Sequence, residues 1–129
     1  VWQPPWCNQW FGAMRDALAV GRDLPHPPLD APGPFGLADA DRTRRVLGAA
    51  GFAGIDFLGV EEPFRIGADA DAAYRFTSGL SGMRALLADL HESQLQLALD
   101  NLRTMLEDHE TVDGVMFDSA AWVVTATKP

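Results

Sequence analysis

The sequence lacks the features that mark several large classes of protein. Its 129 residues include one cysteine, Cys7, so no internal disulfide can form and a reducing, cytoplasmic setting is expected. No apolar run approaches the roughly 20 residues of a membrane-spanning helix, and the N-terminus has no basic-then-apolar signal pattern. We therefore expect no membrane association. The chain begins at Val1 without a methionine, in a strand-like segment, for which we expect truncation, processing or an unusual start.

Motifs for cofactors and metals are also absent. The chain has no Gly-x-Gly-x-x-Gly after a strand, no Gly-Lys-Ser/Thr loop, no Cys-x-x-Cys and no Gly-x-Ser-x-Gly. His91 and His109 lie at predicted helix ends, and no second ligand is spaced to join either of them. The sequence thus gives no catalytic, cofactor-binding or metal-binding residue.

Positive charge is scarce. Ten Lys and Arg residues against 18 Asp and Glu give a net charge of −8, which repels nucleic-acid phosphates unless the cations cluster. The only cluster is Arg42, Arg44 and Arg45, and on a short helix these spread around the surface as a solvated face. We therefore expect no nucleic-acid partner.

What the sequence does contain is an ordinary globular composition and a distinctive final stretch. The apolar share of 47% fits one domain over residues 1–129. Residues 114–128, GVMFDSAAWVVTATK, end in a β-branched run without charge, which predicts a strand buried on both faces. Such a strand needs neighbours, and the sequence offers residues 52–60, with period-two alternation, and a short N-terminal stub, residues 1–3.

Helical periodicity accounts for most of the remainder. We expect Pro63 to end the strand that starts at residue 52. Apolar spacing and capping residues predict helices after Asn8 as far as Gly21, over residues 40–50 with Asp39 as N-cap and Gly51 at the C-terminal end, after Asp69 or Asp71, around residues 83–90, and over residues 93–108. An acidic turn at residues 107–110 is expected to lead to the final strand. The fold class is therefore α+β, a strand pair plus the stub packed with four to five helices.

Two groups of polar residues have ordinary structural interpretations. His26 lies in the proline-rich loop LPHPPLDAPGP, residues 24–34, and has no partner in the sequence for ligation or base catalysis. The acidic pairs Glu61 with Glu62 and Asp69 with Asp71 lie in a turn or at a helix start, where carboxylates stabilise the helix dipole.

One segment has unusual chemistry. Residues 2–11, WQPPWCNQWF, hold three of the four tryptophans and an asparagine next to a strand end. Loops that leave the carboxyl ends of strands often bind ligands in open α/β folds, and tryptophan with amide groups suits a flat or apolar substrate. The candidate substrate-binding residues are Trp2, Asn8, Trp10 and Phe11. Packing in the core is an equally good interpretation of this segment.

Three stretches resemble one family. These are VWQPPWCNQWF, GPFGLADADRTRRVLGAAGFAGIDF and HETVDGVMFDSAAWVVTATKP, and together they resemble the C-terminal half of class I S-adenosylmethionine-dependent methyltransferases of the small bacterial type. The resemblance covers nearly the whole chain. It implies a partial Rossmann-like sheet in which residues 1–3 end the fifth strand, the strand after residue 52 is the sixth, and residues 114–126 form the seventh, antiparallel between those two.

The resemblance also implies where the cofactor site lies. In this family S-adenosylmethionine binds in the N-terminal half, at a glycine-rich loop and an acidic residue, and neither matches a position here, so no cofactor residue is carried over. The first hypothesis is a substrate-side methyltransferase portion that is not catalytic alone. The second is a non-catalytic, homodimeric interaction module derived from such an enzyme. In both, an exposed strand edge recruits a partner, either a second copy or a separate N-terminal methyltransferase half.

Overall fold

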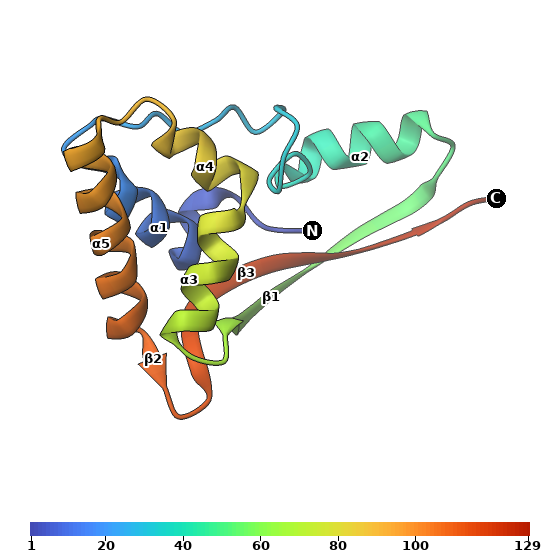
Figure 1. Cartoon of the computed structure of the whole chain (residues 1–129). Coiled ribbons are helices and arrows are strands. Elements are labelled where there is room, and N and C mark those ends of the chain that lie inside the picture. Colours follow the sequence, from blue (N-terminus) through green and yellow to red (C-terminus); the bar gives the residue numbers. More distant parts are fainter. The chain divides into compact units, whose positions relative to one another are not determined.

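The protein is an α+β fold, as predicted, with five α-helices and three strands (Figure 1). The computed structural model describes residues 1–129. The helices are α1 (Gln9–Ala19), α2 (Ala40–Ala49), α3 (Ala70–Gly79), α4 (Ser81–Leu87) and α5 (Glu92–Asp108). The strands are β1 (Ala53–Gly67), β2 (Glu110–Thr111) and β3 (Gly114–Thr127), and a short 3-10 turn, Pro5–Cys7, precedes α1.

The three strands form one antiparallel sheet in the order β1-β3-β2. The final strand is therefore the central one, as expected. β2 was not predicted, because its two residues lie in an acidic segment that we expected to be only a turn. It pairs Glu110 with Val115 and Thr111 with Gly114, and the Thr111 hydroxyl closes the hairpin by donating to the Gly114 carbonyl at 2.8 Å.

The prediction that Pro63 ends the strand is wrong. β1 continues through Pro63 to Gly67, so the segment after the proline belongs to the same strand. The reason lies in the sheet order: β1 is an edge strand, and a proline without an N–H is tolerated at an edge because one row of its backbone groups needs no partner.

The residues group into two compact units. Unit 1 comprises Val1–Asn8, His26–Glu62 and Ser119–Pro129, and unit 2 comprises Gln9–Pro25 and Pro63–Asp118. β1 and β3 contribute residues to both units. The prediction of a single domain over residues 1–129 stays a prediction.

Unit 2 is a cluster of four helices. α5 packs on α1 and α3, and α4 packs on the same two helices. The apolar stripes predicted for α1 and α5 are buried as expected, with Met14, Leu18, Ala98, Leu102 and Leu106 fully inaccessible to solvent. This burial is the main apolar core of the chain.

Unit 1 contains α2, the N-terminal stub and the last part of β3, which pairs with the stub. Asp39 caps α2 as predicted, because its carboxylate accepts from the backbone N–H groups of Asp41 and Arg42. Gly51 follows the helix with a φ of +87°, the left-handed conformation expected at that position. The Thr43 hydroxyl donates to the Leu37 carbonyl at 2.9 Å and ties α2 to the loop before it.

The prediction that the final strand is buried on both faces holds only for part of β3. Val115, Phe117 and Ala120 are buried, but Val123 is 49% exposed and the side chains after Val124 are exposed to solvent. The physical reason is that side chains stand perpendicular to the sheet, so strand pairing alone does not bury them. The ring of His109 stacks on Phe117 and Asn8 lies against Ala120, whereas the side chains after Val124 are open to solvent.

Candidate functional site

The candidate site of unit 1 is built around the N-terminal stub, which forms a short antiparallel ladder with β3. Val1 and Trp122 exchange two hydrogen bonds, from the Trp122 N–H to the Val1 carbonyl at 2.7 Å and from the Val1 amine to the Trp122 carbonyl at 2.9 Å. Trp2 lies opposite Ala121, and the Gln3 N–H donates to the Ala120 carbonyl at 2.9 Å. The expected pairing of the stub with the final strand is therefore present.

Asn8 completes this ladder where the backbone leaves it. In a regular antiparallel pair, the Ala120 N–H would donate to the Gln3 carbonyl. Here the Asn8 carboxamide lies between the two groups: its Oδ1 accepts from the Ala120 N–H at 3.0 Å, and its Nδ2 donates to the Gln3 carbonyl at 3.1 Å. Nδ2 also lies within hydrogen-bond distance of the Pro4 and Ala120 carbonyls. Asn8 is only 1% exposed, so these bonds form away from water.

Trp2 lines a surface pocket of about 480 Å³. The other lining residues are Val1, Gly33, Pro34, Gly36, Leu37 and Ala121. None of these side chains is titratable, and the size falls in the range of small-molecule sites. The pocket can therefore hold a neutral, apolar group by contact.

The loop that forms one wall of this pocket is held at three successive carbonyls. The Gly36 carbonyl accepts from Arg42 Nε at 3.1 Å, the Leu37 carbonyl from the Thr43 hydroxyl, and the Ala38 carbonyl from the Trp122 indole N–H at 3.0 Å. The wall is thus fixed by both α2 and β3 before any ligand arrives, which lowers the ordering cost of binding.

Trp122 is the side chain that sequence reasoning missed. Its ring meets Phe57 edge to face at 6.0 Å between centroids, and a Cβ on Gly59 would lie 3.3 Å from Cζ3 of the indole. The Gln3 side chain also lies next to Gly59, because a Cβ on that glycine would lie 3.3 Å from Gln3 Nε2. The sequence AAW, which contains Trp122, contributes to the predicted strand and to the family resemblance, but neither pattern indicates the contacts of this indole.

The other two candidates lie in unit 2. Trp10 and Phe11 are each 7% exposed and meet edge to face with ring centroids 5.7 Å apart. Phe64 contacts Trp10 in the same manner at 5.8 Å. The structure therefore places Trp2 and Asn8 together in unit 1 beside β3, and Trp10 and Phe11 in the aromatic packing of α1. Whether any of the four contacts a substrate stays a prediction.

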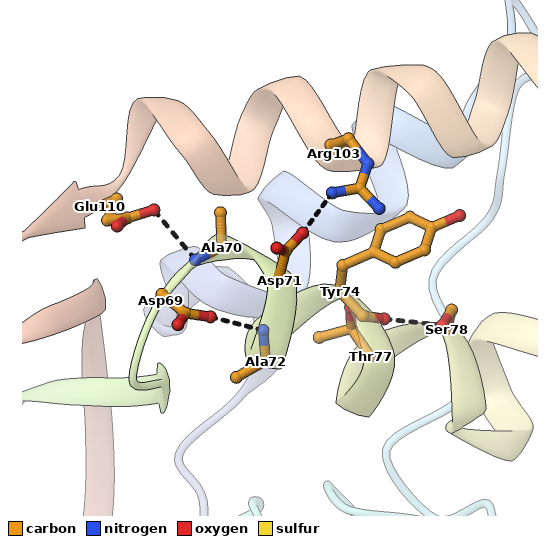
Figure 2. A network of polar contacts seen from close by, with 9 residues as sticks. All are labelled: Asp69, Ala70, Asp71, Ala72, Tyr74, Thr77, Ser78, Arg103 and Glu110. Atoms are coloured by element: carbon orange, nitrogen blue, oxygen red, sulfur yellow. Dashed lines mark hydrogen bonds and ion pairs between the residues drawn. The ribbon is translucent and has the colours of Figure 1, made fainter.

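The most extensive polar network of unit 2 is structural (Figure 2). The backbone N–H groups at the start of α3 are capped twice: Ala72 donates to Asp69 at 2.7 Å and Ala70 donates to Glu110 at 2.9 Å. In the same first turn, Asp71 pairs with Arg103 of α5 at 2.6 Å, and the Arg103 guanidinium lies over the ring of Tyr74 at 4.3 Å. Figure 2 shows Arg103 joining α3 to α5 and Glu110 joining α3 to β2.

Hydrogen bonds shift the pKa values of two charged side chains, Asp39 and Arg103. Backbone hydrogen bonds from Arg42 lower the pKa of Asp39, which is the expected effect of donors on a carboxylate. The hydrogen bond to Asp71 raises the pKa of Arg103. The interpretation of Asp69 as a cap is confirmed by its bond to α3.

The histidines lie apart from the pocket. His26 is exposed in the proline-rich loop. His109 ends α5, where its ring stacks on Phe117 at 4.3 Å and its Nδ1 lies 2.8 Å from the Met105 carbonyl. No group of three or more His, Cys, Asp or Glu side chains is placed to hold a metal ion.

Two further findings bear on function. No helix in the structure combines the length and the apolar character that crossing a membrane requires. No protein-family model matches the chain, and a search of curated proteins gives no match either.

Proposed function

We propose that this chain forms the C-terminal, substrate-side part of a class I S-adenosylmethionine-dependent methyltransferase and does not methylate by itself. The observation that carries the proposal is the strand arrangement in unit 1. β3 is paired antiparallel with the N-terminal stub at Ala121, and β1 is its neighbour in the sheet. The resemblance of the sequence implies this arrangement for the fifth, seventh and sixth strands of that family.

The pocket beside Trp2 supports a substrate-side role. It is lined by Val1 and Trp2 of the stub, which the resemblance assigns to the end of the fifth strand. Its apolar lining and fixed wall suit a neutral or planar group of a methyl acceptor. Asn8 serves this site indirectly, because it fixes the stub that carries Trp2.

The first test is calorimetry with S-adenosylmethionine on the purified 129-residue chain. Because the resemblance places the cofactor site in residues of the N-terminal half, we expect no heat of binding and no transfer of a labelled methyl group to any acceptor. Binding of the cofactor together with methyl transfer by this chain alone would contradict the proposal.

The second test is the coding DNA upstream of Val1 or in a neighbouring reading frame. The proposal predicts a strand followed by a glycine-rich loop and then an acidic residue at the end of the next strand. Joining or co-expressing that segment with this chain should produce cofactor binding, whereas neither part should bind alone.

In the joined enzyme, Trp2 can be tested against a matched control. Trp2→Ala should raise the KM for the acceptor and leave the affinity for S-adenosylmethionine unchanged, because Trp2 lines the apolar pocket. Trp6→Ala removes an indole that is 68% exposed four positions away, and it should leave both constants unchanged. Equal effects of the two variants would exclude the pocket as the acceptor site.

A second candidate function is a non-catalytic interaction module. The observation that favours it is the exposed, uncharged end of β3 after Trp122, because an edge of this kind recruits strands. The partner would be a second copy or a separate methyltransferase half. Sedimentation equilibrium with and without S-adenosylmethionine separates the two functions. A dimer whose stability does not change when the cofactor is added supports the interaction module. A monomer at all concentrations excludes a homodimer.

A further inference from the structure

The direction of the backbone groups along β3 follows from its bonds to the N-terminal stub. Ala120 and Trp122 direct their backbone N–H and C=O groups toward the stub. In an antiparallel strand these directions alternate from one residue to the next. Val124 and Ala126 therefore direct their backbone groups to the same side, beyond the end of the stub, while Val123 and Thr125 direct theirs toward β1.

This edge carries none of the devices that usually block strand addition. Residues 123–127, VVTAT, contain no charge and no proline, and their β-branched side chains favour an extended backbone. Val123, Thr125 and Thr127 are all exposed, so one face of this part of β3 is open to solvent, and Ala126 on the other face is exposed as well. Exposed backbone donors and acceptors in such a run are a template for another strand.

We propose that a second copy of this chain pairs with the edge, β3 against β3, antiparallel and around a two-fold axis at Thr125. In this register Val124 lies opposite the partner subunit's Ala126, and Ala126 lies opposite the partner subunit's Val124. Each of the two pairs exchanges an N–H and a C=O, so four hydrogen bonds form. The arrangement is self-complementary because the two hydrogen-bonding residues are symmetric about Thr125. It specifies the interaction-module function proposed above and does not depend on methyltransferase activity.

The ends of the paired segments fit this register. β3 ends at Thr127, and the partner subunit's Thr127 would lie opposite Val123, just before the position that Val1 occupies opposite Trp122. The partner subunit's Lys128 would come next, opposite Trp122, where Val1 already pairs, so the chain has to leave the ladder after Thr127. β3 ends at that residue, and the ammonium group of Lys128 lies over the ring of Phe52, 5.5 Å from the centroid. Five residues from each copy can therefore pair without displacing the stub.

Sedimentation equilibrium combined with residue-resolved hydrogen exchange tests the proposal. The wild-type chain should be a dimer at high concentration and a monomer on dilution. The amides of Val124 and Ala126 should be protected only in the dimer, whereas those of Val123 and Thr125 should be protected in both states because they point to β1. A monomer at all concentrations, or a dimer without this alternating change in protection, would overturn the proposal.

Two variants address the interface directly. Thr125→Lys places two ammonium groups opposite each other on the two-fold axis, which should weaken the dimer about fivefold through like-charge repulsion. Val124→Pro removes a donor from each of two symmetric hydrogen bonds and should weaken the dimer by roughly tenfold or more. Because Val124→Pro also alters β3 itself, circular dichroism of the diluted variant must first give the wild-type spectrum.

Thr104→Lys is the matched control, because Thr104 is exposed on α5 and its replacement adds the same charge to a helix and not to β3. It should leave dimerisation unchanged. If Thr125→Lys and Thr104→Lys weaken the dimer equally, the effect is one of net charge and the proposed register is wrong. Calorimetry with S-adenosylmethionine on the same samples tests the enzyme proposal separately, since neither result depends on the other.

Discussion

The side chain of Asn8 takes the place of a backbone partner for Ala120, which lies 112 positions later in the sequence. Pro4 and Pro5 end the backbone ladder of the stub because neither residue has an N–H to donate. The carboxamide has a donor and an acceptor in nearly the geometry of a peptide group, so it continues the ladder across the gap. The link joins the two ends of the chain within unit 1.

Replacing Asn8 should therefore destabilise the fold. Asn8→Asp keeps the shape but loses the donor to the Gln3 carbonyl, and we expect a loss of about 2–3 kcal/mol in urea unfolding, because a buried charge and an unpaired carbonyl result. The burial should raise the pKa of the new carboxyl group, so the loss should shrink as the pH falls below that pKa. Asn101→Asp, at a part-buried site with one long bond, should cost less.

The capping network at α3 predicts a difference between two neighbouring aspartates. Asp69→Ala removes a cap and should cost about 1 kcal/mol in thermal or chemical unfolding. Asp71→Ala removes an ion pair whose side chains are 69% and 43% exposed, and it should cost less than about 0.5 kcal/mol. Equal losses would mean that the ion pair contributes as much as the cap.

Replacement by alanine should change the stability of the chain in opposite directions at two glycines. A Cβ on Gly67 would lie 2.8 Å from Cα of Ala73, so Gly67→Ala should destabilise the chain by about 1–3 kcal/mol. A Cβ on Gly48, inside α2, would meet nothing within 4 Å, so Gly48→Ala should stabilise the chain by about 0.5–1 kcal/mol through helix propensity. Midpoints of urea unfolding for the two variants provide the measurement.

Replacing Val20 by glycine should stabilise the fold. It has a φ of +50°, a left-handed conformation that costs a β-branched residue about 1–2 kcal/mol. Val20→Gly should therefore raise the free energy of unfolding by about 1 kcal/mol, although it loses part of the Val side-chain contacts. Val46→Gly, an exposed position inside α2, should lower it by a similar amount, and a loss in both variants would show that the conformation of Val20 is not strained.

The pH dependence of α2 follows from Asp39. Its pKa is lower in the folded chain than the ordinary value of 3.8, so the folded state binds the proton less tightly than the unfolded state does. The contribution of this carboxylate is present above pH 3.8 and is lost as the pH falls through the lower, folded pKa. Asp39→Asn retains a capping oxygen without this titration, so its stability should fall less on acidification than that of the wild type.

The sequence predicts local features of this chain better than distant pairings. Asp39, Gly51 and Asp69 act as predicted because capping depends on residues a few positions away. Asn8 and Trp122 act through contacts more than 80 residues distant, with Ala120 and Ala38, and no short pattern specifies such a contact.

The course of β1 through Pro63 illustrates the same limit. The effect of a proline depends on whether its strand lies at the edge or in the middle of the sheet, and only the sheet order decides that. The exposed end of β3 illustrates this limit again, because burial of an apolar strand depends on which distant parts of the chain pack on its faces.

The position of Pro63 has a consequence for how far association can proceed. β1 forms one outer edge of the sheet, and along that edge Glu61, Glu62 and Pro63 oppose the addition of a strand through charge and a missing N–H. A sheet with two receptive edges can add copies indefinitely and grow into a fibre. With one edge blocked in this way, the proposed pairing of the other edge around a two-fold axis would close the assembly at two copies.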